Sequence, residues 1–192
     1  MSGRTRVLIV DDEKAFVELV AAWLAGGYDV RTALDGETAL ERLAGVDVAL
    51  VDRRMPGLSG EDVLAGVEDR GCDCRSALVS AVRPDLNVVD LPIDDYLVKP
   101  VDREELLATV DALVARGECS DAVRRELALV SKRTAIEAAR GGAELESDPR
   151  FRGLCERIDR LRTRRRARSD GPDDEALAAL QRRDGGAETD RS

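Results

Sequence analysis

Short apolar runs alternate with amphipathic stretches over the first 115 or so residues of the chain. Each run is four or five residues long, as expected of a buried strand, and is bounded by polar or glycine-containing segments. The alternation predicts βαβ units around a parallel sheet. The predicted strands cover residues 6–10, 28–32, 48–51, 77–80 and 95–98.

The stretches between these runs have the spacing of helices packed on one face. Apolar residues recur every three or four positions from Phe16 to Leu24, and Gly26-Gly27 ends that helix. The other predicted helices cover residues 36–43, 60–67 and 102–115.

The connection over residues 81–94 is the weak element of the pattern. Pro84 and Pro92 leave space for little more than one or two helical turns, so a short or irregular element is expected there. With that exception, five strands alternate with helices, and the pattern predicts an α/β domain of the flavodoxin-like doubly wound class.

The C-terminal part of the chain has a different pattern. Arg116-Gly117-Glu118 is interpreted as a hinge that ends a first domain over residues 1–116. Residues 117–168 are predicted to form an all-α hairpin of two amphipathic helices joined by a turn at Gly141-Gly142. Such a hairpin is too small to be stable alone and needs a partner surface. Residues 169–192 are rich in Gly, Asp, Glu and Arg and are predicted to be mostly disordered.

Charge is unevenly distributed along the chain. The net charge is −9, and the acidic excess lies in residues 1–116, which are therefore unsuited to gripping nucleic acid by themselves. Among 30 basic residues only Lys14, Lys99 and Lys132 are lysines, a composition that suits concentrated salt. No apolar run is long enough to span a membrane and no secretory segment precedes the first strand, so a soluble, cytoplasmic protein without membrane contact is expected.

Charged side chains end three of the predicted strands. Asp52 ends one, Asp11 and Asp12 follow another, and Lys99 follows a third. Because parallel strands end at the same edge of a sheet, these groups are expected to converge. Carboxylates held close together repel one another unless a cation neutralises them, and a hard divalent ion, Mg²⁺, meets that need.

The four cysteines do not indicate a second metal site. Their spacing fits no standard zinc motif and the chain has no histidine, so free thiols are expected.

Four segments together carry a specific resemblance: Val10-Asp11-Asp12, Asp52 followed by Met55-Pro-Gly57, Ser80 followed by Ala81, and Tyr96 to Pro100. In this order and at these separations they resemble the receiver domain of two-component response regulators.

The resemblance implies roles for individual residues. Asp52 is the expected phosphoacceptor, with Lys99 and Ser80 assisting at the phosphoryl group. Asp11, Asp12, Asp52 and the backbone carbonyl of Arg54 are the expected Mg²⁺ ligands. Tyr96 resembles the family's switch residue, acting together with Ser80, and the bond between Lys99 and Pro100 is expected to be cis. The phosphodonor is expected to be a sensor histidine kinase, and pairing of two receiver copies is left open.

Other interpretations of these residues stay open at this point. Asp11 and Asp12 can be helix caps, and Asp52 can be a strand-end carboxylate without chemistry. A turnover enzyme is not expected, because a magnesium-dependent phosphohydrolase with an aspartyl nucleophile has a second aspartate two positions later, where this chain has Arg54.

The C-terminal part contains the segments Leu129 to Glu137, Glu144-Leu-Glu146 and Phe151 to Leu161. Over residues 120–162 these segments resemble the HalX-type output region of haloarchaeal response regulators, which implies a role in transcription. Seven arginines between Arg157 and Arg168 form the one basic concentration in the chain. They are either the solvated end of a helix or phosphate contacts to DNA. The preferred interpretation is an output region that contacts a protein of the transcription machinery, and the alternative is a direct DNA-binding transcription factor that uses the arginines.

Overall fold

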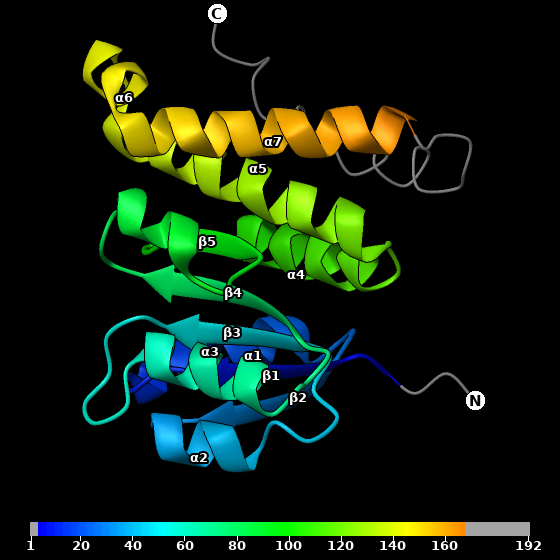
Figure 1. The fold of residues 1–192 in the computed structure, drawn as a ribbon. Coiled ribbons are helices and arrows are strands. Elements are labelled where there is room, and N and C mark those ends of the chain that lie inside the picture. The colour runs from blue at the N-terminus through cyan, green and yellow to red at the C-terminus, as the bar shows by residue number, and fades with distance from the viewer. Residues whose placement is uncertain (1–3, 168–192) are drawn as a thin grey trace, which may run out of the picture.

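The computed structural model describes residues 4–167, and the segment predicted to be disordered, residues 169–192, lies outside the described residues. Five strands form one parallel sheet in the order β2-β1-β3-β4-β5, which confirms the predicted flavodoxin-like class. Figure 1 shows the strands side by side, with two C-terminal helices stacked beyond β5. The strands are β1 (Arg6–Val10), β2 (Asp29–Ala33), β3 (Val48–Asp52), β4 (Arg75–Ser80) and β5 (Asp95–Val98).

Seven α-helices and one 3₁₀ helix accompany the sheet in the described residues. None of these helices has the length and hydrophobicity needed to span a lipid bilayer. They are α1 (Lys14–Leu24), α2 (Gly36–Glu41), α3 (Gly60–Asp69), η1 (Leu86–Asp90), α4 (Arg103–Gly117), α5 (Asp121–Arg140), α6 (Ala143–Ser147) and α7 (Pro149–Ala167).

Apolar side chains cover both faces of the sheet, because successive residues of a strand point to opposite faces. On one face, Val7 and Ile9 pack with the apolar sides of α1 and α4. On the other face, Leu8 and Val10 pack with α3, η1 and Tyr96 of β5. This two-sided coverage explains why a strand such as β3 is almost continuously hydrophobic, since β3 is buried along its whole length.

The fourth connection is short, as its prolines predicted. Its only helical element is the five-residue η1, whose first turn is capped by the carboxylate of Asp85 accepting from the backbone N–H of Asn87. A helix of this length cannot cover its share of the sheet, and Leu86 and Val89 need apolar partners from elsewhere.

The C-terminal hairpin supplies those partners. Leu129 and Ile136 of α5 and Phe151 of α7 pack with Leu86 and Val89 in one buried cluster, and α5 also packs against β5. The partner surface that the hairpin requires is therefore the sheet domain of the same chain.

Two details differ from the sequence-based expectation. Arg116 is not part of an exposed hinge: it is buried in the last turn of α4, donates to the carbonyl of Asp94 and pairs with the Asp95 carboxylate. The link between the long helices is not a simple glycine turn either, because α6 follows Gly141-Gly142 and buries Leu145.

A buried ion cluster joins the two long helices. Glu126 of α5 is 1% exposed, and its two oxygens accept from Nε of Arg162 at 3.1 Å and from Nε of Arg165 at 3.0 Å. A buried carboxylate is costly without such partners, so α7 must stay in place while Glu126 is charged.

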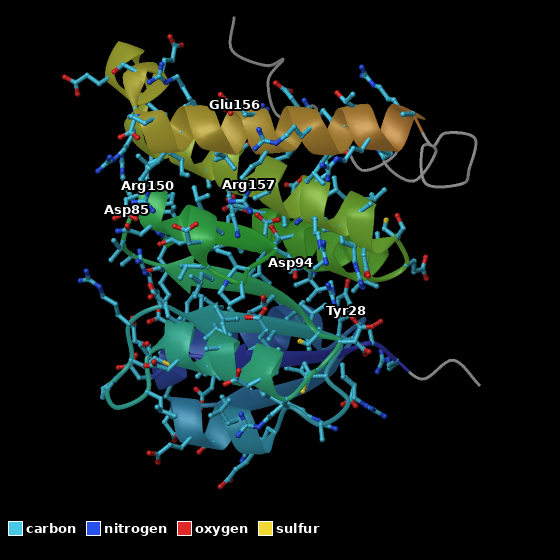
Figure 2. The ribbon with its side chains drawn as sticks, viewed as in Figure 1. Tyr28, Asp85, Asp94, Arg150, Glu156 and Arg157 are labelled. Carbon is cyan, nitrogen blue, oxygen red and sulfur yellow. The ribbon has the colours of Figure 1, made fainter. Side chains whose placement is uncertain are left out.

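Replacing Glu126 by Gln should therefore destabilise the docked hairpin. Losing the charge-assisted bonds should lower the free energy of unfolding by about 1 to 3 kcal/mol, measured by urea denaturation followed by circular dichroism. The control is Glu156→Gln, which removes an exposed i,i+4 partner of Arg160 on the outer side of α7 (Figure 2) and should cost less than about 0.5 kcal/mol. Equal losses in the two variants would contradict a structural role for the buried cluster.

Candidate functional site

The candidate site lies where four neighbouring strands end. Val10 of β1 is in register with Val51 of β3, Asp52 with Val79 of β4, and Ser80 with Val98 of β5. Asp11, Asp52, Ser80 and Lys99 therefore lie at or just beyond four adjacent strand ends. This is the edge at which open parallel sheets build their sites.

Lys99 joins the two buried carboxylates. Its ammonium group lies 2.6 Å from Oδ2 of Asp11 and 3.1 Å from Oδ1 of Asp52, and the two carboxylate residues are only 1% and 6% exposed. Glu13, at 3.8 Å, adds a further negative charge from the exposed side. One cation thus faces three carboxylates, so the site keeps an excess of negative charge even with Lys99 in place.

The pKa shifts of the pair reflect burial and proximity. Burial raises the pKa of Asp11 above its ordinary value, although the hydrogen bonds from Lys99 and from the backbone of Glu13 act in the opposite direction. Burial alone would lower the pKa of Lys99, but its hydrogen bonds to Asp11 and Asp52 outweigh burial and raise it. Lys99 is therefore held firmly as an ammonium ion.

Backbone geometry orients the ends of the site. Oδ2 of Asp52 accepts from the backbone N–H of Arg54 at 2.7 Å, and the backbone N–H of Lys99 donates to the carbonyl of Ser80 at 2.8 Å. The peptide bond from Lys99 to Pro100 is cis, as expected.

The donor set was tested against the predicted divalent cation. Within residues 4–167 no three acidic or cysteine side chains form a ready-made metal cluster, because Asp12 is exposed while Asp11 and Asp52 face Lys99. All the nearby donors are nevertheless hard oxygens. Mg²⁺ keeps several water ligands and is usually held by one or two carboxylates together with phosphate oxygens, so this set fits it.

Ser80 and Tyr96 connect the site with the hairpin. Ser80 is 1% exposed, and its hydroxyl accepts from the backbone N–H of Val82 at 3.2 Å. Tyr96 is buried and donates to the carbonyl of Val82 at 2.6 Å, so both side chains hold the same loop. Ala135 of α5 packs against the cluster that contains Tyr96.

Arg53 connects the site to α3, a contact that the sequence did not reveal. It follows Asp52 and donates to Glu61 of α3 at 2.8 Å. Burial would lower the pKa of its guanidinium, but hydrogen bonds to Glu61 and to Tyr96 raise it. The Arg53 side chain is held against α3 by its ion pair with Glu61.

Two further residues shape the site without carrying its chemistry. A Cβ atom at position 60 would lie 2.1 Å from the backbone oxygen of Asp52, so only glycine allows α3 to begin this close to β3. The ring of Phe16 lies 4.4 Å from the Lys99 ammonium and covers it on one side. The Ser-Gly start of α3 was visible in the sequence, but this close approach was not.

The cysteines and the arginine cluster lie elsewhere. All four cysteines are free thiols, and burial raises the pKa of the Cys74 thiol to about 12, so it stays protonated. Two of the seven clustered arginines, Arg162 and Arg165, turn inward to Glu126. Arg168 lies outside the described residues.

Two family models match the chain. The response regulator receiver domain matches residues 7–111, and the HalX domain matches residues 115–181.

Relatives of this chain are described as transcriptional regulators or as sensory transduction proteins. A Haloferax volcanii protein described as a transcriptional regulator is 41% identical over 84% of this chain and 28% of its own length. The transcriptional regulatory protein DltR of Streptococcus agalactiae is 39% identical over 55% of this chain and 50% of its length. The sensory transduction protein RegX3 of Mycobacterium tuberculosis is 31% identical over 75% of this chain and 66% of its length. The chain thus spans less than two thirds of each of these relatives.

Solved structures show the same fold for the first part of the chain. The response regulator TrrA of Thermotoga maritima, in complex with Mg²⁺ and BeF, is 34% identical with a TM-score of 0.51 over 57% of this chain and 98% of that one. A CheY-like receiver domain of Methanospirillum hungatei is 25% identical with a TM-score of 0.56 over 60% and 98%.

Replacing Asp11 by Asn should stabilise the metal-free protein. Burial disfavours the charged form of Asp11, so an uncharged isostere should raise the free energy of unfolding by about 1 kcal/mol, or about 2 to 4 °C in Tm. Thermal denaturation at pH 7 with and without Mg²⁺ measures this, and the variant should also lose any stabilisation by Mg²⁺. Asp12→Asn, at an exposed position, is the control for the change in stability measured without Mg²⁺. A lower free energy of unfolding in Asp11→Asn than in the wild type would contradict a net cost of burying the charged Asp11 side chain.

Proposed function

Because this chain belongs to the response regulator receiver domain family and carries a HalX domain, we propose that it accepts a phosphoryl group on Asp52. The donor is a sensor histidine kinase, as for receiver domains in general. The observation that carries the proposal is the contact of one ammonium, Lys99, with two nearly buried carboxylates, Asp11 and Asp52, at the ends of three strands. We assign the receiver to residues 1–116 and the output region to residues 117–168.

Asp52 is the nucleophile in this proposal. A carboxylate oxygen of Asp52 attacks phosphorus, the bond from phosphorus to the donor's leaving group breaks, and an acyl phosphate remains on the protein. Such transfer depends mainly on positioning and on neutralising charge. The Arg54 amide holds one oxygen of the nucleophile, and Lys99 faces the other and pairs with a phosphoryl oxygen.

We propose Mg²⁺ as the resident cation, held by Asp11, Asp12, Asp52 and the backbone carbonyl of Arg54. When bound, it supplies positive charge to the phosphoryl oxygens. Asp11 is oriented for this role because its Oδ1 accepts from the Glu13 amide while Oδ2 faces Lys99.

We further propose that the phosphoryl group acts on the hairpin through Ser80 and Tyr96. A Ser80 hydroxyl that donates to a phosphoryl oxygen moves the Ser80–Val82 loop, to which the Tyr96 hydroxyl is bonded. Because α5 packs against β5 and Ala135 contacts the cluster around Tyr96, a shift at this position changes how α5 is held.

The proposed output is a contact with a protein of the transcription machinery. Arg162 and Arg165 are occupied by Glu126, which weakens the alternative of DNA contact through the whole arginine cluster. Release or reorientation of the hairpin exposes surfaces of α5 and α7 that are buried in the docked form.

Incubation of the full chain with acetyl phosphate and Mg²⁺ tests the phosphoacceptor. Intact mass should increase by one phosphoryl group in the wild type and remain unchanged in Asp52→Asn, which preserves shape but removes the nucleophile. Asp69→Asn, at an exposed carboxylate at the end of α3, should be phosphorylated normally. Phosphorylation of Asp52→Asn at the wild-type level would refute Asp52 as the acceptor.

Hydrogen exchange tests the path to the hairpin. Phosphorylation should accelerate amide exchange in α5 and α7, because the docked form is favoured only while Tyr96 and its loop keep their present arrangement. Ser80→Ala should still accept the phosphoryl group on Asp52 but should lose most of the change in α5. An undiminished change in a phosphorylated Ser80→Ala protein would show that the signal takes another route.

A further inference from the structure

A basic cleft lies between the receiver and the hairpin, far along the chain from the phosphoacceptor segments. It has a volume of about 600 Å³ and is lined by the end of η1 and the two residues after it, by Glu68 of α3, by α5 and by α7. Its cationic residues come from both long helices of the hairpin: Arg125, Lys132, Arg157, Arg160 and Arg164. The acidic residues that line it are Glu68 and Asp90.

Few of these cations are neutralised. Asp90 pairs with Arg150 at 3.0 Å, and Arg160 pairs with Glu156 at 3.4 Å. Among the residues that the structure describes, Arg125, Arg157 and Arg164 make no ion pair. The cleft therefore has a net positive charge that its own walls do not balance.

Lys132 forms the inner end of the cleft and is only 5% exposed. Its ammonium donates to the carbonyls of Leu91 at 2.6 Å and Val89 at 3.3 Å. An ammonium has three N–H donors, so one donor has no acceptor among the described residues. The Asp94 carboxylate is nearby, but it accepts from the backbone N–H of Ser76 and forms no ion pair with Lys132.

The electrostatic balance at Lys132 is unfavourable without a ligand. Burial lowers the pKa of Lys132 to about 8, and Arg157 acts in the same direction while Asp94 and Asp90 oppose it. A buried cation beside another cation is costly unless an anion compensates it. Figure 2 shows Arg157 on the side of α7 that faces the receiver, so its charge is directed into this region.

We propose that this cleft binds a small, multiply charged phosphate anion, with Lys132 at the inner end and Arg125, Arg157 and Arg164 around the rim. The planar guanidinium groups match phosphate oxygens, and a volume of this size is ordinary for a small-molecule site. Several cations converging on one space suit a ligand with several negative charges better than a single carboxylate.

The position of the cleft gives the ligand a structural effect. The Leu91 and Val89 carbonyls belong to the receiver, whereas the arginines belong to the hairpin. An anion bound to Lys132 favours its charged form, and because the Lys132 ammonium donates to both carbonyls, the ligand strengthens the contact between the hairpin and the receiver. The concentration of that anion therefore biases the docked form independently of chemistry at Asp52.

Pyrophosphate binding to the full chain tests the proposal. Titration calorimetry and thermal denaturation are carried out with EDTA present and ionic strength held constant with KCl, so that neither Mg²⁺ nor screening contributes. At ten times its Kd, pyrophosphate should raise Tm by about 3 to 6 °C. Lys132→Met should raise Kd about tenfold or more, and Arg157→Gln, at an exposed rim position where folding is unaffected, should raise it about threefold to tenfold.

Two control variants make the result specific. Arg166→Gln removes the same charge from the same helix outside the cleft and should leave Kd unchanged. Asp52→Asn should also bind as the wild type does, because the phosphoacceptor is not part of this site.

Three outcomes would overturn the proposal. Equal losses in Arg157→Gln and Arg166→Gln, or a Tm shift matched by KCl alone, would mean an adventitious ion only. Loss of binding in Asp52→Asn would place pyrophosphate at the phosphoacceptor. Binding of duplex DNA that depends on Arg157, without any response to pyrophosphate, would identify the cleft as a nucleic-acid contact instead.

Discussion

Two nearly buried carboxylates facing one ammonium group set the main constraint on this fold. Holding Asp11 and Asp52 together at the end of the sheet requires Lys99 within hydrogen-bond distance of both, because its positive charge offsets part of their mutual repulsion. That requirement fixes the relative positions of the ends of β1, β3 and β5. It also explains why a rigid, two-sided hydrophobic sheet supports so polar a site, since small shifts in register would separate the charges.

The same sheet needs its C-terminal helices for a different reason. A fourth connection reduced to η1 leaves Leu86 and Val89 uncovered, and α5 and α7 complete their packing. The hairpin is thus part of the hydrophobic core of the protein. Tyr96 donates to the loop that follows Ser80, and Ala135 of α5 packs against the cluster that contains Tyr96.

Much of this organisation could be predicted from the sequence. The strands were found from apolar runs with errors of one or two residues, because strands buried on both faces leave a continuous pattern. The convergence of Asp11, Asp52 and Lys99 followed from the rule that parallel strands end at one edge. The docking of α5, the inward turn of Arg162 and Arg165, and the burial of Arg116 could not be predicted, because each depends on contacts between residues far apart in the chain. Nor does a glycine at a helix start reveal that Asp52 lies against it.

The apolar cluster that joins η1 to the hairpin also affects how the chain folds during synthesis on the ribosome. Leu86 and Val89 emerge well before Phe151 and Ile158, which later enclose them. Until α5 and α7 have been synthesised, Leu86 and Val89 form an exposed apolar patch on the nascent receiver. Nascent chains with an exposed apolar patch are prone to aggregate. In truncated chains that end before α5, Leu86 and Val89 stay exposed. Synthesis of the whole hairpin therefore protects the receiver from aggregation.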